Sequence, residues 1–250
     1  MAKQVGLIRV AGSVGDMTYY KSRDGYLIRE RTSITAERIA SDPKFKRTRE
    51  NMAEFATAAS SGKLMRNAVN TVLKDVKDGR MVARLTKAMA QVIKTDMVHK
   101  RGLRVASGGN LNLLKGFEFN EAAVLATSMY AAYTTAVDKL AGTTTIVFPD
   151  FVPANAIIAP QGATHLKIVS TVAAIDFDGK KWVSVTAKSN VFPWDETPTG
   201  IITLVNTITG GDSLPWFVFL GMQFLQEANG IQYPLLDGGF NALSLIEVFS

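Results

Sequence analysis

Hydrophobic positions change their spacing twice along this chain of 250 residues. Over residues 5–31 they alternate in short stretches, which indicates strands. Over residues 34–100 they recur at the three- and four-residue spacing of a helix, and from about residue 133 short strand-like stretches return. The pattern predicts an α+β fold in three parts: a β-hairpin arm over 1–32, a basic helical domain over 33–104, and an antiparallel β-sandwich domain over 105–250.

The first strands are predicted to form a hairpin. Residues 17–21 and 26–31 flank Asp24-Gly25, and Asp-Gly between two apolar runs is a strong hairpin signal. Because an isolated hairpin is marginally stable in water, we expect these strands to dock on another surface. Four side chains suit a pleated, half-buried surface and form a candidate interaction site on this arm: Tyr19, Tyr20, Tyr26 and Ile28.

The middle of the chain predicts three helices. Asp42 and Pro43 suit the N-cap and the first helical position. Breaks are predicted at Ser60-Ser61-Gly62 and at Asp78-Gly79, which leaves three helices of roughly 15–18 residues. Helices joined by such short turns pack as antiparallel neighbours.

The remainder predicts strands punctuated by Gly, Pro and Asn, which is typical of a sandwich or barrel. Asp178-Gly179 predicts a tight hairpin turn. Residues 105–132 fit helix or strand, and strand is favoured. The expected strands are 133–138, 143–149, 165–177, 181–189, 200–209, 214–225, 229–234 and 242–249.

Charge is distributed unevenly along the chain. Residues 1–104 hold 22 Lys and Arg against 10 Asp and Glu, a net charge of +12, whereas residues 105–250 hold 6 against 12, a net charge of −6. Such asymmetry suggests a basic face that meets nucleic acid, a membrane surface, or the acidic half of a neighbouring copy. The densest basic run is a candidate interaction face: Lys44, Lys46, Arg47 and Arg49. No helix-turn-helix, RNA-recognition or zinc-finger pattern accompanies it.

Catalytic and metal-binding patterns are weak. The chain has no cysteine and only two histidines, His99 and His165, which fall in different predicted domains. Ser60-Ser61-Gly62-Lys63 lacks the first glycine of a phosphate loop, and Asp176 to Gly179 lacks the closing glutamate of a calcium loop. We therefore expect a protein that is not an enzyme, with no catalytic residue, cofactor, metal site or small-molecule substrate.

The sequence shows neither a secretory signal nor a run of about 18 apolar residues that would cross a membrane. We expect synthesis in the cytoplasm. Release or assembly outside the cell stays open.

Two blocks of the sequence resemble a family of uncharacterised Bacteroidota proteins of about 250 residues. The first runs from Gly12-Ser13-Val14-Gly15-Asp16 through Tyr19-Tyr20-Lys21, Asp24-Gly25 and Arg29-Glu30. The second runs from Phe224 through Gln226-Glu227-Ala228-Asn229-Gly230 to Tyr233-Pro234-Leu235. The resemblance implies a bacterial source and brings no catalytic residue.

These observations favour a structural protein that self-associates into a filament, lattice or particle. Its contacts would run head to tail between the basic helical and acidic β-rich parts. Two alternatives stay open. One is a nucleic-acid-associated packaging or regulatory protein of phage or mobile-element origin, which would use the basic helices. The other is a carbohydrate- or surface-binding β-sandwich module, which would use an exposed aromatic residue: Trp182, Trp194 or Trp216.

Overall fold

The structure is a computed structural model, and it describes residues 2–6, 8–22, 24–31, 34–209, 213–235 and 238–250. It is a mixed fold with 26% helix and 35% strand. The chain divides into two compact units, Met1–Asn51 and Met52–Ser250, called here the N-terminal unit and the main unit. Each unit is described by itself. The domain boundaries expected after residues 32 and 104 stay predictions.

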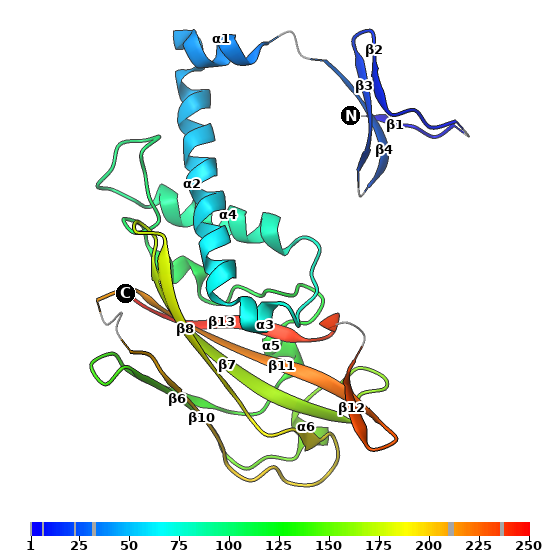
Figure 1. The fold of residues 1–250 in the computed structure, drawn as a ribbon, viewed down its shortest axis with the longest axis vertical. Helices are drawn as coiled ribbons and strands as arrows, with labels where there is room; N and C mark the ends of the chain where they lie inside the picture. The colour runs from blue at the N-terminus through cyan, green and yellow to red at the C-terminus, as the bar shows by residue number, and fades with distance from the viewer. Residues whose placement is uncertain (1, 7, 23, 32–33, 210–212, 236–237) are drawn as a thin grey trace. The chain divides into compact units, whose positions relative to one another are not determined.

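The N-terminal unit begins with a four-stranded antiparallel sheet (Figure 1). Its strands lie in the order β1-β4-β3-β2 and are β1 (Ala2–Lys3), β2 (Gly12–Val14), β3 (Met17–Ser22) and β4 (Gly25–Glu30). The expected pair is therefore part of a larger sheet, with Met17 opposite Glu30 and Ser22 opposite Gly25.

Two short helices follow in the same unit, α1 (Ala36–Ser41) and η1 (Pro43–Phe45). Thr35 caps α1 by accepting a hydrogen bond from the Arg38 backbone N–H. Asp42 caps η1 by accepting from the Lys44 N–H, and Pro43 takes the first position, as the sequence predicts.

The main unit is built on a large antiparallel sheet whose two long strands are β7 (His165–Asp176) and β11 (Trp216–Ala228). These strands pair over ten residues, from Trp216 opposite Ala174 to Leu225 opposite His165. Along the outer edge of β7 lie β8 (Lys181–Lys188) and β9 (Phe192–Pro193), and along the outer edge of β11 lie β12 (Ile231–Pro234) and β13 (Ala242–Phe249).

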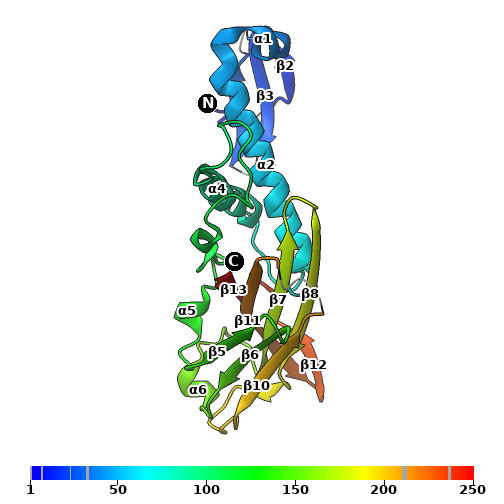
Figure 2. The same cartoon turned by 90° about the vertical axis from the view of Figure 1, so that its left-hand side faces the viewer.

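Both faces of this sheet are covered, which makes the main unit three layers deep (Figures 1 and 2). One face packs on the helical layer of α2 (Lys46–Ala68), α3 (Asn70–Leu73) and α4 (Met81–Lys94). The other packs on a three-stranded sheet of β5 (Thr134–Asp138), β6 (Thr143–Phe148) and β10 (Ile202–Thr207). Short helices η2 (Leu111–Leu114), α5 (Leu125–Ser128) and α6 (Pro153–Ala156) complete it.

Burial of the sheet on both faces explains the nearly continuous apolar run of β11. Phe217 and Phe219 point to the helical layer, and the residues between and beside them point to the small sheet: Trp216, Val218, Leu220 and Met222. The side chains alternate faces because the strand repeats every two residues.

Two expectations about the elements are wrong. The first is the helix break at residues 60–62, because α2 runs unbroken through them to Ala68. Gly62 instead lies where α2 meets α4, and a Cβ at Gly62 would stand 3.5 Å from the Leu85 side chain. Gly62 therefore lies in a contact between two helices, with ordinary van der Waals room for a Cβ, and does not form a turn. The expected arrangement of three antiparallel helices is not confirmed, since α3 is only four residues long.

The second concerns residues 105–132, which form no strand and contain η2 and α5. They form two isolated bridges, Glu118 to Ser244 of β13 and Met129 to Ile157, and further backbone hydrogen bonds join Gly116 and Phe119 to β13. Their apolar residues serve the core instead, and Leu111, Leu114 and Phe119 are buried. The strands predicted from residue 133 onward are confirmed, each within a few residues of its expected bounds.

Candidate interaction surfaces

The register of the N-terminal sheet places three of the four predicted arm residues on one face. Tyr19 lies opposite Ile28, and Tyr26 lies opposite Lys21 on the same face. Tyr20 lies opposite Leu27 on the other face. Val14 and Met17, which are paired and exposed, extend the first face. The apolar residues of this face, called here the apolar face, are Val14, Met17, Tyr19, Tyr26 and Ile28; Lys21 and Glu30 lie on the same side of the sheet.

The N-terminal unit buries none of its described residues. Its tyrosines are shielded mainly by cations: the Arg9 guanidinium lies 5.0 Å and the Lys21 ammonium 5.7 Å from the Tyr26 ring centre. On the other face, the Arg29 guanidinium lies 5.7 Å from the Tyr20 ring centre. A sheet is normally stabilised by covering one apolar face with another layer, and among the described residues of this unit none is buried by such a layer.

The four basic residues of the run at residues 44–49 have different surroundings. Arg49 donates hydrogen bonds to the backbone carbonyls of Ile39 (2.8 Å) and Asp42 (2.9 Å), so it fixes α1 against the start of α2. Arg47 pairs with Glu50 at 2.9 Å. Lys44, Lys46 and Arg47 are exposed. No sequence pattern predicts these hydrogen bonds of Arg49, because the carbonyl groups that accept them lie at the end of the preceding helix.

Exposed apolar residues continue into α2. Within this helix, every residue of which the structure describes, no side chain before Ala58 is buried. Met52 and Phe55 lie three residues apart, on neighbouring positions of the helix surface, and are 57% and 63% exposed. Neither side chain belongs to the two core clusters of the main unit.

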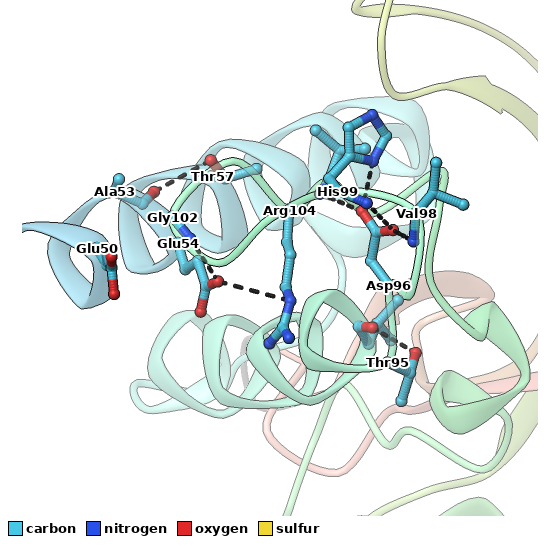
Figure 3. A network of polar contacts seen from close by, with 12 residues as sticks. Glu50, Ala53, Glu54, Thr57, Thr95, Asp96, Val98, His99, Gly102 and Arg104 are labelled. Carbon is cyan, nitrogen blue, oxygen red and sulfur yellow. Dashed lines mark hydrogen bonds and ion pairs between the residues drawn. The ribbon is translucent and has the colours of Figure 1, made fainter. Parts of the chain in front are cut away.

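A buried carboxylate organises the loop after α4, over residues 96–105, called here the anchored loop (Figure 3). Asp96 is fully buried and accepts hydrogen bonds from the backbone N–H groups of Val98 (2.9 Å), His99 (3.1 Å) and Val105 (3.0 Å). The Nδ1 atom of His99 lies 2.8 Å from its Oδ2 atom. Burial alone would raise the pKa of Asp96, but these hydrogen bonds outweigh it and hold the pKa well below its usual range.

Glu54 of α2 fixes the other limb of the anchored loop. Its Oε1 atom accepts a hydrogen bond from the Gly102 N–H at 2.9 Å and lies 3.9 Å from the Arg104 Nε atom (Figure 3). Gly108 packs against the Asp96 carboxylate at the start of the loop, where a larger residue would clash, because a Cβ there would stand 2.7 Å from the carboxylate. The His99 ring is therefore held by Asp96, and the sequence did not indicate this loop.

Of the three tryptophans, only Trp182 is exposed enough to serve as a binding surface. Trp216 is buried in the core, and the Trp194 indole N–H donates to the Ile157 carbonyl at 2.9 Å. Trp182, 41% exposed, lines a groove of about 580 Å³ between α2 and the β7–β8 hairpin, together with Ser60, Lys63 and Asp178.

The remaining sequence candidates have structural partners. The His165 Nε2 atom lies 3.5 Å from Glu227, and Asp195 accepts a hydrogen bond from the Thr197 N–H in an exposed loop. Among the described residues, no group of three His, Asp or Glu lies close enough to hold a metal ion. Nor does any helix in the described part of the chain have the length and apolarity needed to cross a membrane.

Comparison with known proteins finds no family model, curated protein or solved structure that matches the chain. The resemblance to the Bacteroidota family stays a prediction. The function is therefore argued from the surfaces described above.

Proposed function

We propose that this chain is a non-enzymatic structural subunit that self-associates into a filament, lattice or particle through its N-terminal unit. The observation that carries the proposal is the four-stranded sheet in a unit that buries none of its described residues. The apolar face is the surface of this unit that needs a partner.

The energetics favour covering this face. Burying a large apolar side chain contributes roughly 1.5–3 kcal/mol, and the apolar face carries five such side chains on two pairs of neighbouring strands. A unit of about 50 residues has little core of its own, so this contribution decides whether its sheet is stable. A partner that supplies a second layer therefore stabilises the sheet as it binds.

Another copy of the chain suits this role by its charge. Residues 1–51 hold 11 Lys and Arg against 6 Asp and Glu, a net charge of +5, whereas residues 105–250 carry −6. A contact between two different surfaces of this kind is heterologous, and such contacts propagate into rings or open fibres. The edges of the sheet at β1 and β2 also offer unpaired backbone groups for strand addition.

A matched pair of double variants tests the proposal. Tyr19→Ser with Ile28→Ser removes the cross-strand pair of the apolar face, and Tyr20→Ser with Leu27→Ser removes the equivalent pair of the opposite face. We expect light scattering to show large particles for the wild type and for the second variant, and small species for the first. Equal particle sizes for both double variants would contradict a specific role for the apolar face.

Nucleic-acid binding is a measurable alternative, since Lys44, Lys46 and Arg47 are exposed. A gel shift on generic DNA that weakens steeply with salt would favour it. The proposal above predicts no shift that depends on these three residues.

A further inference from the structure

The tip of the anchored loop exposes three large apolar side chains. Met97, Val98 and Leu103 are 90%, 81% and 70% exposed. A solvated loop normally carries small or polar residues at its tip, and exposed apolar patches mark binding surfaces.

The loop holds these side chains in a fixed arrangement. Asp96 binds both limbs through Val98 and Val105, and the Leu103 N–H donates to the Lys100 carbonyl at 2.9 Å, which closes a turn at the tip. Glu54 adds the hydrogen bond from Gly102. Since binding then costs little ordering of the backbone, the tip is preorganised for contact.

The exposed charges of the loop are positive, and Glu54, the acid that α2 places against the loop, is half-buried beside Gly102 and Arg104. Within residues 96–105, all of which the structure describes, Asp96 is the only acid, and it is buried. Lys100 and Arg101 are exposed beside the apolar residues, and Lys94 is exposed at the end of α4. The partner must therefore offer an apolar interior behind a negatively charged surface.

We propose that the anchored loop docks on an anionic lipid surface, with Met97, Val98 and Leu103 entering the acyl boundary and Lys100 and Arg101 facing the headgroups. An apolar face flanked by cations is the recognised composition of such interfacial contacts. A convex tip needs no complementary cavity in a lipid surface.

Other partners match less well. A nucleic acid would pair with the cations and leave the three apolar side chains in water. The three grooves on a second copy each carry one carboxylate beside two lysines: Asp178 with Lys63 and Lys180, Asp176 with Lys180 and Lys181, and Asp75 with Lys74 and Lys167. None of the three therefore offers the net negative charge that the cations of the loop would favour.

Vesicle co-sedimentation of the full-length protein tests the inference. We expect binding to vesicles of phosphatidylcholine mixed with phosphatidylserine and weaker binding to phosphatidylcholine alone. Two variants, Met97→Ser/Val98→Ser/Leu103→Ser and Lys100→Glu/Arg101→Glu, are expected to lose affinity by roughly tenfold or more. Leu140→Ser is the matched control, because Leu140 is 97% exposed on the turn between β5 and β6 and should leave affinity unchanged.

Three outcomes would overturn the inference. The first is no binding to the anionic vesicles, and the second is equal binding by wild type and both loop variants. The third is a smaller particle mass of the loop variants measured without lipid, which would make the loop a contact between protein chains. Because the mass measurement is independent of vesicles, failure of this inference is distinguishable from failure of the self-association proposal.

Discussion

Replacing Asp96 by Asn keeps the shape of the side chain and removes its charge. If the Asn oxygen takes the place of Oδ1, it still accepts from Val98 and His99. The Asn NH₂ then faces the Val105 N–H and the His99 ring nitrogen, which lie 3.0 and 2.8 Å from Oδ2 in the native loop. His99 accommodates the change by switching tautomer, but the Val105 N–H has no acceptor.

The magnitude follows from these contacts. An unsatisfied buried N–H costs about 1–3 kcal/mol, and the loss of charge weakens the two retained hydrogen bonds by about half. Together they amount to roughly 2–4 kcal/mol of local stability. Because about 1.4 kcal/mol is a factor of ten, amide hydrogen exchange at Val98, His99 and Val105 should accelerate by roughly 30- to 1000-fold.

Asp195→Asn is the control, since Asp195 accepts one backbone hydrogen bond at its Oδ1 atom in an exposed loop. We expect no comparable change there. Acid titration supplies a second test. Because the pKa of Asp96 is lower in the folded loop than in the unfolded chain, its ionised carboxylate stabilises the loop fully above the unfolded pKa of Asp. This stabilisation is lost as pH falls through the folded pKa. Protection should therefore persist down to about pH 4. Unchanged exchange in Asp96→Asn would refute the anchoring role.

Two further predictions concern packing. Gly62→Ala should raise the free energy of unfolding by about 0.5–1 kcal/mol, because the new Cβ fits within a helix at 3.5 Å from the Leu85 side chain. Gly109→Ala should lower the free energy of unfolding, because its Cβ would stand 2.3 Å from the Val92 carbonyl oxygen. Urea unfolding compares the two variants, and equal effects would be inconsistent with this packing. Phe119→Ala should lower the free energy of unfolding by about 3–5 kcal/mol, because the fully buried ring contacts Phe117 and Phe219 edge to face. A decrease under 1 kcal/mol in the same assay would argue against the packing of this core.

The sequence was sufficient to predict the strands of the main unit. Their apolar runs are long, and turn signals such as Asp178-Gly179 separate them, so local information determines their bounds. Gly62 shows where local information fails, because a glycine suits a break or a close contact equally well, and only its neighbour Leu85 on α4 decides.

The candidate surfaces were predictable to a different extent. Alternation places Tyr26 and Ile28 of β4 on one face and separates Tyr19 from Tyr20 on β3. The pairing register, which the sequence analysis did not assign, then brings Tyr19 to the face of Tyr26 and Ile28. The anchored loop was not predictable, because nothing in the sequence shows that Asp96 is buried or that Glu54, 48 residues before Gly102, reaches its backbone.

Sedimentation velocity tests the proposed self-association most directly. The full-length protein is measured over a range of concentrations, beside a variant that lacks residues 1–32. If the uncovered sheet finds its second layer on other copies, the full-length protein sediments as large species and the shortened protein as a small one. A full-length protein that stays monomeric at the highest concentration would contradict self-association.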